Sequence, residues 1–531
     1  MDDKLREEIN RRRTFAIISH PDAGKTTLTE KFLLFGGAIN TAGSVKGKAN
    51  SKYAVSDWMD IEKERGISVT SSVLQFNYDG YCINILDTPG HQDFSEDTYR
   101  TLMAADSAVM VIDASKGVEA QTIKLFKVCV MRHIPIFTFI NKMDRDARDT
   151  FELLDDIETV LGIKTCPVNW PIGSGKEFKG VYDRKTKIVS TFQAISTGGA
   201  KKAEETDYHI DDEALKELVG PYLFDQFNEE IELIDGATEE MDIEKVRAGE
   251  LSPVFFGSAL NTFGIEQFLN YFLKMTTPPI GRNSSEGIID PVTEPFSAFV
   301  FKIQANMNKA HRDRIAFMRI CSGKFEANME VKHVQSKKKM RLSQPQQIMA
   351  QERKIVDEAY AGDIIGVFDP GIFSIGDTVC LPKDDFEYEG IPTFAPEHFA
   401  RVIQLDSMKR KQFVKGVEQI AQEGAIQIFQ EHEAGFAEII VGVVGTLQFD
   451  VLKYRLENEY NCEIRLEPLP YQAIRWIKDR DTDMNKLRGV SEVKKVKDMR
   501  GNPLLLFKNE WGIQFVLDRN EGLELVEFSK E

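Results

Sequence analysis

The feature that most constrains this chain is a polar loop between an apolar run and a helix-compatible segment. The apolar run covers 14–18, the helical pattern covers 28–34, and the loop between them reads Ser19, His20, Pro21, Asp22, Ala23, Gly24, Lys25, Thr26, Thr27. Strand, tight loop and helix in this order are typical of a phosphate-binding loop, in which backbone N–H groups converge on phosphate oxygens. We expect Lys25 to reach the β- and γ-phosphates and the Thr26 hydroxyl to ligate Mg²⁺.

The loop departs from the usual pattern at its first position. Ser19 stands where the pattern has glycine. Because serine tolerates a positive φ poorly, the loop must be entered in a backbone conformation that is open to residues other than glycine. A chance Gly-Lys-Thr at a turn is the alternative interpretation, and the motifs that follow argue against it.

A second motif closes the apolar run 81–86. It reads Asp87, Thr88, Pro89, Gly90, His91. A carboxylate at the carboxyl end of a strand is well placed for Mg²⁺, usually through a coordinated water. Gly90 has no side chain, so its N–H can face a γ-phosphate. We therefore predict that Asp87 belongs to the metal site.

Two further strand ends complete the pattern. After the apolar run 134–140 come Asn141, Lys142, Met143, Asp144, and after the run 252–257 come Ser258, Ala259, Leu260. The Asp144 carboxylate can accept from both the ring N–H and the exocyclic amine of guanine, whereas adenine presents a different edge. Asn141 can brace the loop, and the backbone of the last motif could contact guanine O6. Because ligands bind at the carboxyl ends of strands in open α/β sheets, we expect these loops to surround one GTP or GDP.

The order of these patterns predicts a multidomain chain. We expect an α/β P-loop domain over 1–280, with an inserted subdomain at about 165–248 that interrupts the alternation of strands and helices. Alternating apolar runs separated by Gly-containing turns predict a β-barrel domain over 281–390. Mixed helices and strands predict an α+β domain over 391–531.

Three helical segments outside the P-loop motifs are also expected. An acidic helical stretch covers 211–248 within the insertion. In the last domain the apolar periodicity predicts helices over 409–432 and 444–460.

Composition limits what else the chain can be. Its net charge of −17 argues against broad nonspecific binding to nucleic acid. Local basic patches are candidates for contact with RNA on a large partner, with solvated charged faces as the alternative; they are 11–13, 337–341 and 409–411. No run approaches about 18 apolar residues, the amino terminus is too charged for a signal peptide, and the six cysteines form no Cys-x-x-Cys pair. We therefore expect a cytoplasmic protein with reduced thiols and no membrane association.

Together these motifs resemble those of the translational GTPases. Five segments carry the resemblance, and they are 19–27, Arg65-Gly66-Ile67-Ser68, 87–91, 141–144 and 258–260. The histidine that follows Asp-Thr-Pro-Gly separates this family from most other GTPases. A barrel after the nucleotide-binding domain fits the family as well.

Within the family, the chain is most similar to the branch that acts in translation termination. The segments 14–21, 56–59 and 141–148 carry this closer resemblance, which covers the whole chain. Elongation factor G continues through further carboxyl-terminal domains, and elongation factor Tu lacks the large insertion. The resemblance implies a GTP-hydrolysing factor that acts on the bacterial ribosome, including its RNA, and promotes departure of class-I release factors after peptide release. We expect a monomer that uses GTP/GDP and Mg²⁺.

The resemblance also implies roles for single residues. His91 would position the water that attacks the γ-phosphate, and the ribosome would press it into place. Ser68 stands where most members have threonine as the switch ligand of Mg²⁺; a serine hydroxyl can do the same, and Thr70 is a nearby substitute. Pro21 stands where relatives usually carry an aliphatic residue beside the catalytic histidine. The assigned metal-site residues are Thr26, Ser68 and Asp87, and the assigned catalytic residue is His91.

Three alternatives stay open. An ATP-using P-loop protein would have no use for the Asp144 carboxylate, and a module that binds nucleotide only as a structural ligand would have none for Lys25 and His91. A translocation or ribosome-recycling GTPase related to elongation factor G would keep the same chemistry. Only the resemblance separates that last alternative from a termination factor.

Overall fold

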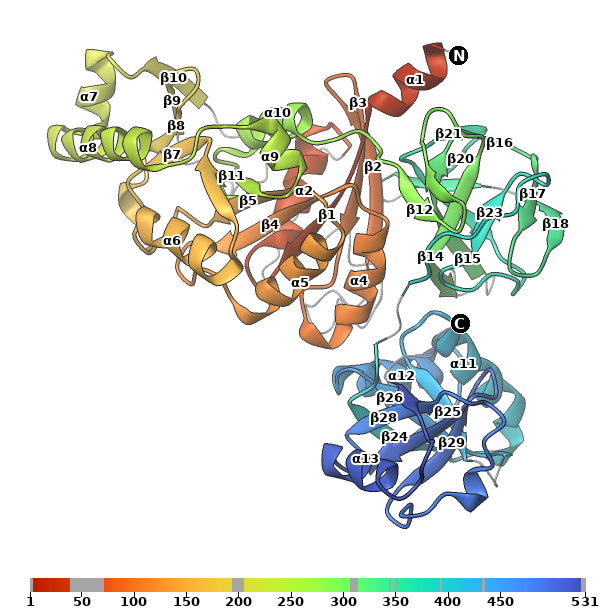
Figure 1. Ribbon diagram of the computed structural model, residues 1–531. Helices are drawn as coiled ribbons and strands as arrows, with labels where there is room; N and C mark the ends of the chain where they lie inside the picture. Colours follow the sequence, from red (N-terminus) through yellow and green to blue (C-terminus); the bar gives the residue numbers. More distant parts are fainter. Residues whose placement is uncertain are drawn as a thin grey trace.

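The computed structural model describes residues 3–38, 71–192, 205–305, 314–342, 345–349, 352–391, 394–431 and 435–526. The predicted switch segment with Arg65-Gly66-Ile67-Ser68, the alternative ligand Thr70 and the segment 56–59 lie outside the described residues. The sheets follow one another along the chain (Figure 1). The domain limits near residues 280 and 390 stay a prediction.

The first part of the chain folds around a seven-stranded sheet, which we call the α/β domain (β1 to α10). Its strands, in sheet order, are β2 (Ser72–Tyr78), β3 (Tyr81–Asp87), β1 (Arg12–Ser19), β4 (Ser107–Asp113), β5 (Ile136–Asn141), β11 (Leu251–Phe256) and β6 (Lys164–Pro167). Only β2 runs antiparallel to its neighbour. The carboxyl ends of β1, β3, β4, β5 and β11 therefore meet at one edge, where the predicted motifs lie.

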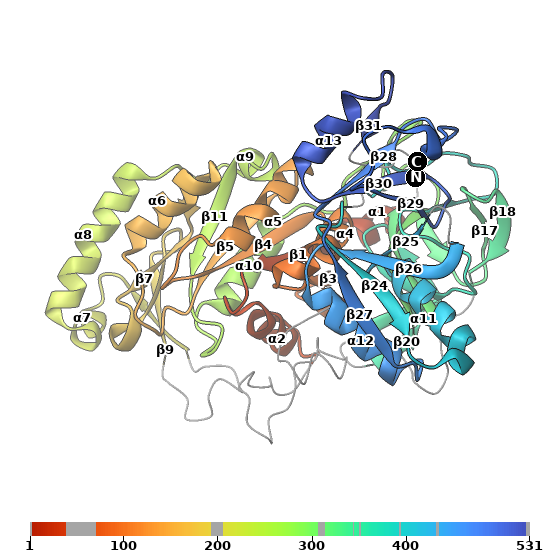
Figure 2. The same ribbon diagram turned by 90° about the horizontal axis from the view of Figure 1, so that it is seen from below.

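Helices cover both faces of this sheet because its central strands are apolar on both sides. Along β1, Ile17 belongs to one apolar core and Ile18 to the other, and both are fully buried. The helices are α2 (Lys25–Phe35) and α10 (Ile265–Met275) on one face, and α4 (Ser95–Met103), α5 (Ala120–Met131) and α6 (Thr150–Leu161) on the other. Figure 2 shows α2 and α10 opposite α5 and α6.

The insertion forms a projecting arm at one end of this sheet (Figure 1). It contains an antiparallel sheet of β7 (Asn169–Ile172), β8 (Gly180–Asp183), β9 (Ile188–Phe192) and β10 (Glu205–His209), followed by α7 (Glu213–Val219), α8 (Pro221–Ala237) and α9 (Ile243–Arg247). The acidic stretch 211–248 is thus three helices, because Gly220 (φ 90°) ends α7 and Pro221 begins α8. The strand β6, part of which was expected in the insertion, pairs with β11 in the main sheet.

The middle of the chain forms the barrel domain. Its eight-stranded sheet has the order β18 (Lys338–Arg341), β17 (Glu330–His333), β23 (Thr378–Cys380), β14 (Ser297–Ala305), β15 (Arg314–Ser322), β22 (Ile364–Phe368), β19 (Gln346–Met349) and β20 (Glu352–Ile355), with β16 (Lys324–Glu326) and β21 (Glu358–Tyr360) paired beside it. A hairpin of β12 (Arg282–Ser284) and β13 (Gly287–Ile289) precedes it. The amino-terminal helix α1 (Asp3–Asn10) belongs with this domain, since Ile9 lies in the barrel's apolar core.

The last part of the chain forms the C-terminal domain, an α+β fold as expected. Its sheet has the order β27 (Ile464–Leu469), β24 (His398–Gln404), β26 (Gly435–Val443), β25 (Gln427–Glu431), β29 (Lys494–Asp498), β30 (Pro503–Phe507), β28 (Ala473–Ile477) and β31 (Leu525–Val526). Its helices are α11 (Arg410–Gln422), α12 (Leu447–Asn458) and α13 (Glu510–Leu517). The helix predicted over 409–432 is wrong in its second half, because Gly424 (φ 76°) turns the chain and β25 follows.

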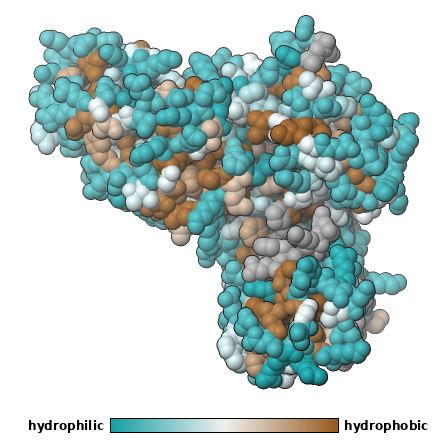
Figure 3. Space-filling view, viewed as in Figure 1, coloured by the Kyte–Doolittle hydropathy of each residue, from teal (hydrophilic) through white to brown (hydrophobic). Residues whose placement is uncertain are grey.

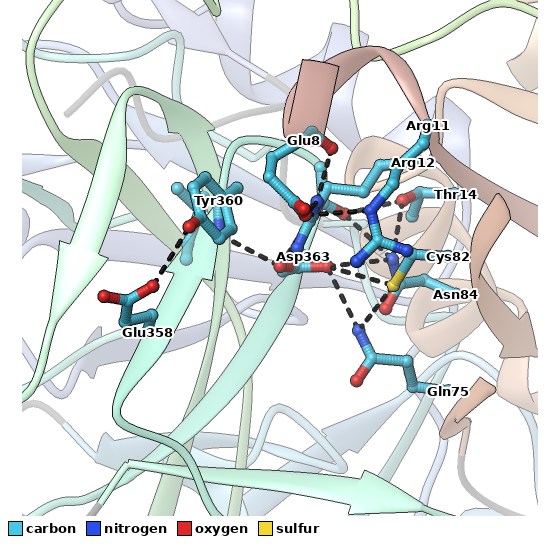
Figure 4. Close-up of polar contacts among 12 residues, drawn as sticks. Glu8, Arg11, Arg12, Thr14, Gln75, Cys82, Asn84, Glu358, Tyr360 and Asp363 are labelled. Carbon is cyan, nitrogen blue, oxygen red and sulfur yellow. Dashed lines mark hydrogen bonds and ion pairs between the residues drawn. The ribbon is translucent and has the colours of Figure 1, made fainter. Parts of the chain in front are cut away.

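A buried carboxylate, that of Asp363, fixes the barrel domain to the α/β domain (Figure 4). One of its oxygens accepts hydrogen bonds from Arg12 Nε at 2.8 Å and from the Tyr360 N–H at 2.9 Å, and the other accepts from Gln75 Nε2 at 3.1 Å. Asp363 is fully buried and Arg12 is 5% exposed. A buried charge is tolerated only when it is paired and hydrogen bonded, so this cluster determines how the two domains meet.

Close backbone packing accompanies this ion pair. Gly362, next to Asp363, has φ 103° and its carbonyl accepts a hydrogen bond from Thr14 Oγ1 at 2.6 Å. A Cβ atom at Gly362 would lie 2.6 Å from Pro279 Cγ and 3.0 Å from Arg12 Cβ. Only glycine therefore fits at this point of the interface.

The basic runs differ in what they do. In the run 11–13, Arg12 and Arg13 are both buried, and Arg13 Nη1 donates to the carbonyl of Asn10 at 2.7 Å. This run is therefore not a face for RNA, because its guanidinium groups bind partners inside the molecule. The run 337–341, by contrast, lies largely exposed in and beside β18.

The face of the molecule shown in Figure 3 is hydrophilic over most of its area, with hydrophobic side chains in patches over the α/β and C-terminal domains. Among the helices that the structure describes, none combines the length and the apolar character needed to cross a membrane.

We predict that Asp363→Ala loosens the interface between the α/β and barrel domains. The change breaks the buried ion pair between the domains and leaves Arg12 with Glu8 as its carboxylate partner, and breaking a buried ion pair costs about 3–5 kcal/mol of folding free energy in comparable sites. The expected result is a clear fall in Tm by differential scanning calorimetry. The control is Asp385→Ala, which removes an exposed partner of Lys332 and should leave Tm nearly unchanged. Equal Tm values for the two variants would contradict the role given to Asp363.

Candidate nucleotide-binding site

The phosphate loop leaves β1 without a positive φ at Ser19. Ser19 is buried and still pairs with β4, and the left-handed conformations fall at Asp22 (φ 66°) and Gly24 (φ 97°). Aspartate tolerates this conformation better than most residues. A Cβ atom at Gly24 would collide with the amide of Asn141, so this glycine is required by packing as well as by φ. The helix α2 begins immediately after it, at Lys25, and its free N–H groups face the loop.

The Lys25 ammonium lies beside the Asp87 carboxylate. Lys25 Nζ is 2.6 Å from Asp87 Oδ1, and the two residues are 6% and 3% exposed. The pairing of β1 with β3, which places Ile17 opposite Asp87, brings them together. Two predicted site residues from separate motifs therefore occupy one buried position at the mouth of the phosphate loop. Thr26, which follows Lys25, is partly exposed on the first turn of α2.

The Asn141 side chain joins three of the predicted loops. Its Nδ2 donates to the Ala23 carbonyl at 2.8 Å, and its Oδ1 accepts from the N–H groups of Lys142 and Ala259, both at 2.8 Å. The bracing role predicted for Asn141 thus extends to the last motif. It also means that the Ala259 N–H, which could have contacted guanine O6, is bonded to Asn141 in this structure.

Lys142 crosses from the third motif to the first. Its Nζ donates to the Asp22 carbonyl at 2.5 Å and to Asp113 Oδ2 at 2.7 Å. Burial alone would raise the pKa of Asp113, but hydrogen bonds from Lys142 and Ser115 hold this pKa below its usual value. Sequence reasoning did not single out Asp113, although it ends β4 just as Asp87 ends β3.

Asp144 carries an acceptor that nothing else in the described chain uses. Its Oδ1 is buried and has no hydrogen-bond partner among the residues that the structure describes. A buried, unpaired carboxylate oxygen is costly unless a ligand supplies a donor. Guanine offers two donors on one edge, as the motif predicts.

His91 is the N-cap residue of the short 3-10 helix η1 (Gln92–Phe94), which follows the second motif. Its Nδ1 accepts from the Asp93 N–H at 3.3 Å and lies 3.4 Å from Asp93 Oδ1, and about a third of its side chain is exposed. Because Nδ1 faces Asp93, Nε2 is the nitrogen left to act on a ligand. A Cβ atom added at Gly90, the preceding residue, would lie 3.5 Å from the Cα of Pro21.

The four described motifs therefore converge at one edge of the sheet. They come from the carboxyl ends of β1, β3, β5 and β11, and hydrogen bonds link all four of them. Ser68, the remaining predicted residue of the metal site, lies outside the described residues. The roles of all these residues toward a nucleotide stay predictions.

Comparison with known families divides the chain into three matches. Residues 10–278 match the elongation factor Tu GTP binding domain, residues 295–381 match elongation factor G domain 2, and residues 388–517 match the C-terminal domain of the class II release factor RF3. The first match covers the α/β domain with the loops described above, so the chain is a guanine nucleotide-binding GTPase. The multidomain fold predicted from the sequence is confirmed.

Relatives match over nearly the whole length. Proteins named peptide chain release factor 3 are 58% identical in Symbiobacterium thermophilum (98% of this chain and 98% of the relative), and 54% identical in Gloeobacter violaceus (99% and 99%). A crystal structure of a protein from Thermus thermophilus shares the fold at 20% identity, with a TM-score of 0.68 over 92% of this chain and 72% of that chain. The resemblance inferred from the motifs is confirmed: this chain belongs to the peptide chain release factor 3 family of translational GTPases.

Proposed function

We propose that this chain is a ribosome-dependent GTPase of translation termination, which promotes the dissociation of class-I peptide release factors from the ribosome after peptide release. The observation that carries the proposal is the combination of one converged nucleotide site with a class II release factor C-terminal domain at residues 388–517. The named relatives support it by aligning from end to end.

The proposed partners are the bacterial ribosome, including its RNA, and a class-I release factor. We expect the protein to act as a monomer in the cytoplasm. Of the basic runs 337–341 and 11–13, the exposed run 337–341 is the better candidate for contact with ribosomal RNA, because two of the three arginines of the run 11–13 are buried.

The proposed metal is Mg²⁺, and the donors present suit it. Thr26 offers a hydroxyl and Asp87 a carboxylate, the hard oxygen ligands that Mg²⁺ prefers, and Ser68 would complete the set. When bound, the ion would supply positive charge that stabilises the phosphate oxygens during the reaction. Lys25, 2.6 Å from Asp87, supplies a second positive charge at the same place.

The proposed reaction is attack of water on the γ-phosphate of GTP. In phosphoryl transfer the protein contributes positioning and charge stabilisation rather than covalent chemistry. His91 Nε2 would orient the attacking water, and the backbone N–H groups of the phosphate loop and α2 would hold the phosphates. Asp144 would select guanine and Asn141 would keep the base-binding and phosphate-binding loops in register.

We predict that His91→Ala binds GTP normally but loses ribosome-stimulated hydrolysis. Loss of a positioned acid–base group costs about 100-fold or more in rate. The measurement is phosphate release with and without ribosomes that carry a bound class-I release factor. The control is His133→Asn, since His133 is exposed with φ 51° and asparagine accepts that conformation. Wild-type rates from His91→Ala would remove His91 from the mechanism.

The same assay tests the proposed step. Stimulation by ribosomes holding a class-I release factor, with release of that factor, supports the termination role. Stimulation only by ribosomes poised for translocation or recycling would favour the alternative related to elongation factor G.

We predict that Asp144→Asn exchanges base specificity. The amide cannot accept from both guanine donors, so GTP affinity should fall by at least about 100-fold, the equivalent of two charge-assisted hydrogen bonds. Xanthosine triphosphate, which has a carbonyl where guanine has its amine, should bind this variant better than GTP. Isothermal titration calorimetry measures both, with the exposed Asp155→Asn as the control. Unchanged GTP affinity, or tighter binding of ATP than GTP by the wild type, would contradict the assignment.

A further inference from the structure

Asp93 lies between the catalytic loop and the C-terminal domain. It is 7% exposed. Its N–H donates a hydrogen bond to Nδ1 of His91 at 3.3 Å, and its Oδ2 accepts a hydrogen bond at 2.8 Å from the N–H of Leu447, at the start of α12. One residue thus connects the histidine of the α/β domain to a helix of another domain.

The start of α12 needs this connection. The side chain of Thr446, at the N-cap position, makes no capping hydrogen bond. Gln448 Oε1 accepts from the N–H groups of Val444 and Gly445, at 2.9 and 3.1 Å, which leaves the Leu447 N–H for Asp93. Aspartate is among the preferred capping residues, and the positive end of the helix favours its charge. Asp93 therefore caps α12 from another domain.

The backbone of the C-terminal domain approaches Asp93 unusually closely. A Cβ atom at Gly445 would lie 2.5 Å from the Cα of Asp93 and would collide with its side chain. Any side chain at Gly445 must therefore push α12 away from η1.

Further contacts hold the helix that follows η1. Arg100 of α4 pairs with Glu96 and donates from Nη1 to the carbonyl of Gly424 in the C-terminal domain at 3.1 Å. The C-terminal domain is therefore attached to α4 near the end of α11 and to η1 at the start of α12.

The N–H of Asp93 donates to Nδ1 of His91 at 3.3 Å, which orients the ring and leaves its proton on Nε2, so the position of Asp93 determines where Nε2 points. We propose that Asp93 is a positioning residue for His91, and that the start of α12 holds Asp93 in place, so that the C-terminal domain sets the orientation of the catalytic histidine. This inference rests on the proposed role of His91. Movement of the C-terminal domain away from α4 would release Asp93 and leave His91 without its partner.

The first test replaces Asp93. In Asp93→Asn the side chain keeps its size and an acceptor for Leu447; Asp93→Ala removes the contact with Leu447, so that the N–H of residue 93 is no longer held beside His91. Loss of an orienting partner costs about 10- to 100-fold in activity at comparable sites. We expect kcat for ribosome-stimulated GTP hydrolysis to fall by that factor in Asp93→Ala and to stay near the wild-type value in Asp93→Asn, with GTP affinity and KM for ribosomes unchanged in both.

The second test acts from the other domain. Gly445→Ala leaves every residue of the catalytic loop in place but adds a methyl group against Asp93. It should lower kcat as Asp93→Ala does. The control is Gly512→Ala in the same domain, where an added Cβ atom makes only ordinary contacts, the nearest at 3.4 Å.

A spectroscopic measurement separates orientation from a merely structural role. The ring-nitrogen NMR signals of His91, assigned with His91→Ala, report its tautomer in the free protein. We expect them to shift in Asp93→Ala and Gly445→Ala, and to stay in Gly512→Ala. Unchanged signals, or wild-type kcat in Asp93→Ala and Gly445→Ala, would overturn the inference. If His91→Ala itself hydrolysed GTP normally, the proposed function of His91 would fail instead, whatever the ring signals showed.

Discussion

One side-chain amide, that of Asn141, holds the nucleotide loops in a single arrangement. It bonds to Ala23 in the phosphate loop and to Ala259 in the last motif, and its own neighbour Lys142 reaches Asp22. The side chains of Asn141 and Lys142 thus bond to backbone groups of the other loops, and these hydrogen bonds hold the loops in fixed relative positions. The sheet brings four loops to one edge, and the Asn141 amide connects three of them by hydrogen bonds.

The motifs of this site could be predicted because each is local. A strand, a turn and a few polar residues lie within about ten positions, and the parallel sheet then places every strand end at the same edge. Asp363 with Arg12 and Asp93 with Leu447 could not be predicted, since these partners stand 351 and 354 residues apart. The spacing of apolar and polar residues within one segment cannot indicate a contact with a residue so far away along the chain. The error in the helix over 409–432 has a different cause, because the left-handed turn at Gly424 outweighs the apolar spacing.

The two domains that follow the α/β domain are attached to it in different ways. The barrel domain is held by buried ion pairs, Arg12 with Asp363 and Arg319 with Asp106 at 2.6 Å. The C-terminal domain bonds to α4 and η1 through single backbone groups, at Leu447 and Gly424. Separation of the barrel would leave charges unpaired, whereas separation of the C-terminal domain returns backbone groups to water. The second movement is therefore the less costly of the two.

The position of Ile9 has a consequence for how the chain is made. This residue packs in the barrel core, yet the barrel strands are translated only after the entire α/β domain. During synthesis the apolar side of α1 therefore stays uncovered while the sheet of the α/β domain folds. A segment that is translated before the α/β domain is thus covered only after that domain, when the barrel has folded.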